Sequence, residues 1–188
     1  MSALPSIKQQ MSTLIALPSI SSTLGEYDLS NEAVIHQLAN WCENLGFKVD
    51  IQCVNKERKK FNLLASLGTG PGGLILSGHT DTVPCNENRW NSDPFKLTEK
   101  DDRLYGLGSC DMKGFFTLAL TAVASMDKSK LKAPIFILAT SDEETSMDGA
   151  RALASLGLPK ARAAIIGEPT GLKPINMHKG IMMESAKI

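Results

Sequence analysis

One histidine and five acidic residues have the types and the placement to carry out chemistry. Each lies shortly after an apolar run or just before an amphipathic stretch: His79, Asp81, Asp111, Glu143, Glu144 and Glu168. The apolar runs 74–77, 137–140 and 164–167 have the length and composition of buried strands. Because ligands of open α/β sheets bind beyond the carboxyl ends of the strands, we expect these side chains to meet at one rim of a sheet.

An imidazole and several carboxylates at one rim form a hard nitrogen and oxygen environment, which suits zinc, cobalt or manganese. Carboxylates packed so closely resist ionisation unless a cation or a shared proton stabilises them. A pair of divalent metal ions is the simpler explanation. Taken singly, a His-x-Asp sequence or an acidic pair is more often a turn or a solvated surface, but four such sites at strand ends and helix starts favour a metal centre.

Glu143 and Glu144 are neighbours whose side chains diverge along the chain, so they need not share one role. One can bind metal while the other transfers protons. That division suits amide hydrolysis, in which a glutamate takes a proton from the attacking water and returns it to the leaving amine, while metal ions polarise the carbonyl. Asp81, two residues after His79, is placed to orient the imidazole through its other ring nitrogen.

The composition excludes several classes of partner. Twenty basic residues balance twenty acidic ones among the 188 residues, so no net field favours nucleic acid or an anionic membrane, and we expect a small polar substrate. The N-terminus lacks a secretory signal pattern and no apolar stretch approaches the ~20 residues of a membrane span, which predicts a cytoplasmic protein. The cysteines have no CxxC spacing, which argues against disulfides and a thiolate zinc site: Cys42, Cys53, Cys85 and Cys110.

The alternation of apolar runs with amphipathic stretches is typical of an α/β fold. Helical spacing predicts a helix over about 30–45, with Ser30 as its N-cap and Gly46 just beyond its end. A shorter helix is predicted over 6–17, ended by Pro18.

The predicted strands fall into two groups. Segments 47–54 and 61–67 are predicted as a hairpin joined by the charged run 56–60, which is interpreted as a solvated loop. Three continuous apolar runs are predicted as strands buried on both faces at the centre of the sheet: 73–77, 135–140 and 163–166. Crossover helices are predicted after Asp111 and after the acidic pair, and a last strand near 181–188. The fold class is therefore α/β, with a mainly parallel mixed sheet flanked by helices.

Four segments resemble the successive motifs of the co-catalytic zinc aminoacylase and carboxypeptidase family, and the similarity runs through nearly the whole chain. They are Gly78–Pro84 (GHTDTVP), Tyr105–Gly114 (YGLGSCDMKG), Asp142–Glu144 (DEE) and Gly167–Thr170 (GEPT). The resemblance implies a zinc-peptidase-like catalytic domain with two Zn²⁺, for which Co²⁺ or Mn²⁺ can substitute.

The resemblance also implies a role for each candidate residue. It implies four metal ligands: His79 and Glu168 on the first metal, Asp111 bridging both, and Glu144 on the second. Glu143 becomes the general acid and base, and Asp81 stands behind His79. A cis peptide bond is implied after Asp111.

The resemblance leaves part of the family pattern unmatched. Family members continue through an inserted dimerisation domain and the rest of the catalytic domain, which supplies a further histidine to the second metal. We therefore expect 1–178 to be the N-terminal part of a truncated catalytic domain and 179–188 the start of the dimerisation domain. The second metal site is expected to be incomplete, and the full-length protein to be a homodimer. His36 and His178 are interpreted as structural or surface residues.

The function implied is metal-dependent hydrolysis of a small N-acylated amino acid. Four stretches are most similar to one group of amino-acid deacetylases within the family: 17–21, 89–90, 93–95 and 143–147. The reaction this implies is removal of the acetyl group from the α-nitrogen of ornithine, in arginine synthesis. The alternatives are desuccinylation of N-succinyl-diaminopimelate, a carboxypeptidase, a folded metal-binding fragment without activity, and a cysteine-dependent hydrolase using Cys110. An uncovered sheet edge is expected to promote self-association.

Overall fold

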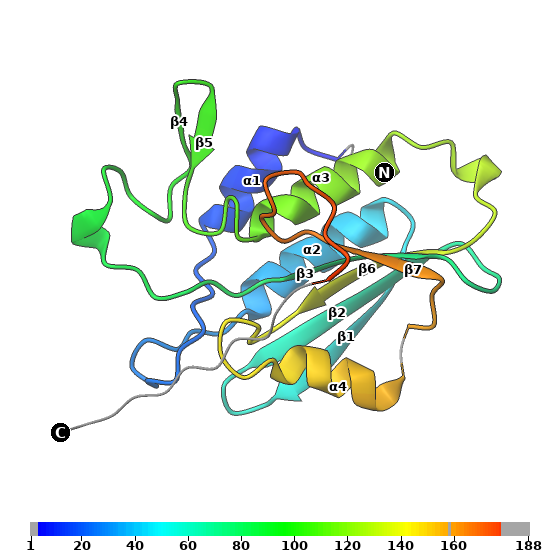
Figure 1. Ribbon diagram of the computed structural model, residues 1–188, viewed down its shortest axis with the longest axis horizontal. Helices are drawn as coiled ribbons and strands as arrows, with labels where there is room; N and C mark the ends of the chain where they lie inside the picture. Colours follow the sequence, from blue (N-terminus) through cyan, green and yellow to red (C-terminus); the bar gives the residue numbers. More distant parts are fainter. Residues whose placement is uncertain (1–3, 158, 178–188) are drawn as a thin grey trace.

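Five strands form one sheet in the order β1-β2-β6-β3-β7 in this computed structural model, which describes residues 4–157 and 159–177 (Figure 1). The strands are β1 (Lys48–Asn55), β2 (Lys60–Leu67), β3 (Leu74–His79), β6 (Ile135–Thr140) and β7 (Ala163–Ile166). β3 pairs in parallel with β6 and β7, whereas β2 pairs antiparallel with β1 and β6. Four strands therefore run one way and β2 runs the other, which confirms the predicted mainly parallel mixed sheet.

Helices cover both faces of this sheet. α1 (Ile7–Ile15), α2 (Glu32–Asn44) and α3 (Lys113–Ala124) lie on one face, where α2 contacts β1 and β2 and α3 contacts β3. α4 (Asp148–Leu156) contacts β1 and β2 from the other face (Figure 1). Outside the sheet, β4 (Thr98–Lys100) and β5 (Arg103–Tyr105) form a small hairpin, and η1 (Glu87–Arg89) and η2 (Lys128–Lys130) are 3₁₀ turns.

The apolar core fills the space between the sheet and the first three helices. Its fully buried members include Leu14 of α1, Leu38 of α2, Leu63 of β2, Phe116 of α3 and Ile137 of β6. Burying each such side chain contributes roughly 1.5–3 kcal/mol relative to leaving it in water. The core therefore holds β3 and β6 rigidly at the centre of the domain, and these two strands end at the candidate site.

The predicted helices are present, with one difference at the start of α2. The predicted helix over 6–17 is α1, which Ser6 caps in a capping box with Gln9. Asn31 rather than the predicted Ser30 occupies the N-cap position of α2, but its side chain does not cap the helix, and the Ser30 hydroxyl accepts the Glu32 N–H at 3.0 Å. The Asn31 amide instead donates to the Phe61 carbonyl and to Thr80 Oγ1. An asparagine next to a serine at a helix start is ambiguous in the sequence, because either side chain can cap.

The charged run 56–60 connects the two strands of a hairpin, as predicted, since β1 and β2 pair antiparallel. Its interpretation as a solvated loop was wrong for Arg58 and Lys60. Lys60 is the first residue of β2 and is only 1% exposed. Its ammonium lies 2.8 Å from Asp28 Oδ1 and 3.1 Å from Asp142 Oδ1. Arg58 contacts the same two aspartates. Buried lysines occur when carboxylates compensate their charge, and those partners come from distant segments.

The prediction that 163–166 lies at the sheet centre was also wrong. The segment forms a strand, but β7 is at the edge of the sheet and all four of its residues are exposed, with Ile165 and Ile166 at 51% and 62%. The run 135–140 is the central strand, as predicted. An apolar run forms a strand buried on both faces only if other elements cover both faces of that strand. Among the described residues, α4 contacts β1 and β2, at the opposite end of the sheet from β7.

Other sequence predictions have mixed outcomes. Within the described residues no helix is long and apolar enough to cross a membrane. None of the four cysteines forms a disulfide there. His36 lies exposed on α2, which agrees with a surface role. His178, the boundary at 178/179 and the strand near 181–188 lie outside the described residues.

Candidate metal centre

The carboxyl ends of three adjacent parallel strands bring the candidate residues to one rim. His79 is the last residue of β3 and pairs in register with Thr140, the last residue of β6. Glu143 and Glu144 follow in the loop between β6 and α4, and Glu168 comes two residues after β7. Asp111 lies two residues before α3. The placement expected for ligands of an open α/β sheet is therefore the placement seen.

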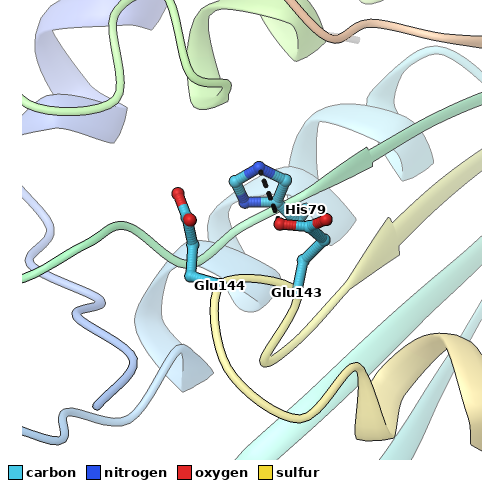
Figure 2. Close-up of side chains that lie close together, drawn as sticks. All are labelled: His79, Glu143 and Glu144. Atoms are coloured by element: carbon cyan, nitrogen blue, oxygen red, sulfur yellow. Dashed lines mark ion pairs between the residues drawn. The ribbon is translucent and has the colours of Figure 1, made fainter. Parts of the chain in front are cut away.

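The Nε2 atom of His79 faces three carboxylates. It lies 3.1 Å from Asp111 Oδ1, 3.8 Å from Glu143 Oε2 and 3.8 Å from Glu168 Oε1. Figure 2 shows the carboxylates of Glu143 and Glu144 on either side of the imidazole ring, both from the loop after β6. His79 is buried whereas the acids are half-buried or exposed, so the cluster opens to solvent.

The described residues form two groups in which three potential ligand atoms lie within 4.8 Å of one another. One group is His79, Asp111 and Glu168, and the other is His79, Glu143 and Glu144. The first group is the set implied for the first metal. Asp111 and Glu144, implied to share the second metal, do not fall in the same group among these residues. Nitrogen and carboxylate ligands in threes suit a divalent ion of the zinc, cobalt or manganese type.

The second nitrogen of His79 is held by Asp81, mainly through the backbone. His79 Nδ1 is 2.9 Å from the main-chain oxygen of Asp81 and 3.6 Å from its Oδ1. A proton on Nδ1 can be donated to that oxygen, which leaves the Nε2 lone pair directed at the acids, as metal ligation requires. The Asp81 carboxylate accepts the Glu144 N–H through Oδ2 at 3.0 Å, and its Oδ1 is buried without a hydrogen-bond partner. Asp81 therefore links the histidine to the loop between β6 and α4 that carries Glu143 and Glu144, here called the glutamate loop.

The electrostatics of the cluster also fit a cation. Burial and, to a smaller extent, the neighbouring acids together raise the pKa of Glu144 to about 7, although His79 lowers it. Burial likewise raises the pKa of Glu168. Burial lowers the pKa of His79, but the negative charges of Asp81, Glu143, Glu168 and Glu144 outweigh that effect and raise it overall. Carboxylates with raised pKa values around one imidazole are stabilised as anions by a bound cation.

Several residues that hold the centre were not among the sequence predictions. Thr80, between His79 and Asp81, donates its hydroxyl to the Thr140 carbonyl and accepts from Asn31. Asn62 bonds to the N–H of Ser141 at the start of the glutamate loop. The polar residues Lys60 and Asn62, with the apolar Phe61 between them, could have signalled a polar face at the start of β2. The cis peptide bond implied after Asp111 is present.

Comparison with known proteins agrees with this geometry. The model of Peptidase family M20/M25/M40 matches residues 75–181. The chain is 55% identical to an acetylornithine deacetylase of Proteus mirabilis (strain HI4320) and 54% identical to one of Klebsiella pneumoniae (strain 342), each over 185 residues. Both alignments cover 98% of this chain and 48% of the relative. The chain therefore spans about half the length of the curated relatives it matches.

Two solved structures share the fold. Human carnosine dipeptidase 1 has a TM-score of 0.70 at 22% identity, over 85% of this chain and 37% of that chain. An M20 family metallo-carboxypeptidase, Sso-CP2 from Sulfolobus solfataricus, also has a TM-score of 0.70 at 22% identity, over 87% of this chain and 37% of that chain. At this identity the likeness concerns the arrangement of helices and strands.

Proposed function

Because the chain belongs to Peptidase family M20/M25/M40, we propose that it carries the metal-binding residues of a hydrolase that converts N2-acetylornithine to ornithine and acetate. The observation that supports this most strongly is the convergence of Asp111, Glu143 and Glu168 on one ring nitrogen of His79. The choice of substrate rests on the relatives, which are named acetylornithine deacetylases at 54–55% identity. The full-length protein is proposed to be a homodimer.

The metal complement is proposed to be two Zn²⁺, replaceable by Co²⁺ or Mn²⁺. His79 and Glu168 would hold one ion, Glu144 would hold the other, and Asp111 would be a ligand of both. Such ions supply Lewis acidity, which polarises the scissile carbonyl and lowers the pKa of water. The proximity of His79, Asp111 and Glu168 supports the first of these sites. The second metal site is proposed to be incomplete in this chain. Among the described residues, the one histidine besides His79 is His36, which is exposed on α2.

Glu143 is proposed to transfer the proton during hydrolysis. Its carboxylate accepts a proton from the attacking water as the new C–O bond forms, and donates it to the amine nitrogen as the C–N bond breaks. Glu143 is suited to this because it is partly open to solvent and lies 3.8 Å from His79 Nε2. Asp81 is proposed to orient His79, which it contacts through its backbone oxygen.

Hydrolysis assays with the metal-loaded chain test this function. We expect acetate release from N2-acetylornithine that chelation abolishes and added zinc or cobalt restores, with Glu143→Gln reducing the rate by at least ~100-fold, as for loss of a general acid and base. Faster hydrolysis of N-succinyl-diaminopimelate, or of a peptide C-terminus, would instead identify one of the alternative substrates.

Two other outcomes would replace the proposal. Tight zinc binding without turnover of any of these substrates would identify a folded metal-binding fragment. Activity that survives chelation and is lost when Cys110 is alkylated would identify a cysteine-dependent hydrolase.

A further inference from the structure

The two glutamates of the metal centre follow a residue with an uncommon backbone conformation. Asp142, directly before Glu143, has φ of 56°. Its carbonyl accepts the N–H groups of Thr145 and Met147, which closes the loop after β6 into a compact turn. A left-handed conformation is unfavourable for residues other than glycine, although aspartate tolerates it better than most, and it persists where surrounding contacts enforce it. The direction of Glu143 and Glu144 therefore depends on what holds Asp142.

Asp142 is held by two basic residues from the β1–β2 hairpin. Its carboxylate is fully buried, with Oδ1 3.1 Å from Lys60 Nζ and Oδ2 3.0 Å from Arg58 Nη2. Ser21 Oγ also donates a hydrogen bond to Asp142 Oδ1 at 2.9 Å. Lys60 is itself buried and also contacts Asp28 Oδ1 at 2.8 Å, while Arg58 reaches Asp28 Oδ2 at 3.3 Å. Two cations thus face two buried anions, and removal of either cation leaves carboxylate charge uncompensated.

Asn62 of β2 also binds the loop that follows β6. Residues two apart on a strand share a face, so Asn62 lies beside Lys60 on the side that α4 covers. Asn62 Oδ1 accepts the Ser141 N–H at 3.2 Å, and its Nδ2 donates to the Gly149 carbonyl at 2.9 Å. The turn is therefore fixed at its start by Asn62, at Asp142 by Lys60 and Arg58, and at the start of α4 by Asn62 again.

We propose that Lys60 and Arg58 are positioning residues of the metal centre, which lock the Asp142 turn and thereby direct Glu143 and Glu144 toward His79. Neither basic residue touches the ligand cluster. Their effect passes through Asp142, because the next two residues after it are the glutamates. This role depends on the proposed function, since the turn matters for metal binding only if one of the two glutamates is a ligand.

Zinc affinity of folded variants tests the proposal. Lys60→Met and Arg58→Met should weaken the zinc ion that depends on Glu144 by about 10–100-fold, the usual effect of losing an outer partner of a ligand. The ion held by Asp111 and Glu168 should be unaffected. Lys60→Arg, which keeps the charge, should restore most of the affinity. Substituting Co²⁺ for zinc gives a second readout, because its visible spectrum reports the ligand arrangement and should change in Lys60→Met.

A double-mutant cycle separates positioning from general stability. In a Glu144→Gln background, Lys60→Met should cause little further loss of zinc affinity, because both changes act on the same ligand. Leu38→Ala, in the core between the sheet and α2, should lower stability and leave zinc affinity and the cobalt spectrum unchanged. Arg58 is 35% exposed, so Arg58→Met provides a folded variant if Lys60→Met does not fold.

Two results would overturn the proposal, and they differ from each other. Variants at Lys60 and Arg58 that bind zinc like the wild type and give its cobalt spectrum would reduce the two residues to a structural role. A wild-type chain that binds no zinc would overturn the proposed metal centre, and the positioning role with it.

Discussion

Phe115 of α3 lies directly against the backbone of Gly167, one residue before Glu168. A Cβ atom at Gly167 would stand 2.1 Å from the Phe115 ring, far closer than atoms can pack. Of the two residues after β7, Gly167 is therefore required for packing against Phe115, and Glu168 supplies the carboxylate near His79. Gly167 lets the chain pass over α3 and bring Glu168 to within 3.8 Å of His79.

Gly167→Ala is predicted to damage the metal centre through this contact. Overpacking costs about 1–3 kcal/mol, and the displaced backbone carries Glu168 away from His79, so zinc affinity should fall by at least ~10-fold. Chelator competition and urea unfolding measure the two effects. Phe115→Ala in the same chain should recover zinc affinity by making room. Gly25→Ala, where nothing lies within 4 Å of the new Cβ, is the matched control, and an equal loss there would contradict this explanation.

Metal stoichiometry is predicted to be one tight zinc ion per chain, with a second bound more weakly. His79, Asp111 and Glu168 form the more complete set, whereas the second site has no further histidine among the described residues beyond His36. Titration of metal-free protein followed by metal analysis after gel filtration measures this. His79→Ala should abolish tight binding, while His36→Ala, at an exposed position of α2, should not change it. Failure to retain any zinc would contradict the convergence of these ligands.

The stability of the metal-free chain is predicted to fall as pH rises from 5 to 8. Burial raises the pKa of Glu144 to about 7 and also raises the pKa of Glu168. The folded state thus binds more protons than the unfolded state between the ordinary carboxyl pKa and about 7, so stability is full below that window and is lost across it.

Zinc should reverse this dependence, because its ligands bind as anions and its contribution grows with pH. Urea unfolding at both pH values, with chelator and with zinc, tests the sign. Glu144→Gln should flatten the dependence of the metal-free chain, and a metal-free wild type that is more stable at pH 8 than its own Glu144→Gln variant would contradict the assignment.

The cysteines are predicted to differ sharply in reactivity. Burial, with a smaller contribution from Glu43, raises the pKa of Cys42 to about 12, whereas Cys53 and Cys110 are exposed. Since the thiolate is the reactive form, Cys42 should react at least ~100-fold more slowly than the other two at pH 8. In a Cys85→Ser background, a chromogenic disulfide reagent should count two fast thiols in the folded chain and three in denaturant. Rapid labelling of a third thiol in the folded chain would show that the core around α2 opens.

The chain is predicted to associate through β7. Ile165 and Ile166 are 51% and 62% exposed on an edge strand, and an unprotected apolar edge pairs readily with another chain. Light scattering should show an apparent mass that rises with concentration. Ile165→Lys should reduce it, because charge on an edge strand opposes pairing, whereas Leu24→Lys, at a similarly exposed site outside the sheet, should not. A constant monomer mass would exclude this association.

The sequence by itself determined the residues of the candidate metal centre and the elements that present them. His79, Glu143 and Glu168 each follow an apolar run, and residues after parallel strands must reach one rim because the strands share a direction. The hairpin of β1 and β2 and the helices after Asp111 and Glu144 follow from local periodicity in the same way. These features depend on neighbouring residues, so a linear pattern records them.

Only the tertiary structure decided which segments face one another and what is covered. The exposed position of β7 depends on the order of strands across the sheet, which the run 163–166 does not encode. Lys60 looks like a solvated charge because Asp28 and Asp142, which neutralise it, lie 32 and 82 residues away. Burial and charge compensation are sums over distant neighbours, and so the ion network behind the glutamate turn becomes visible only when the chain is folded.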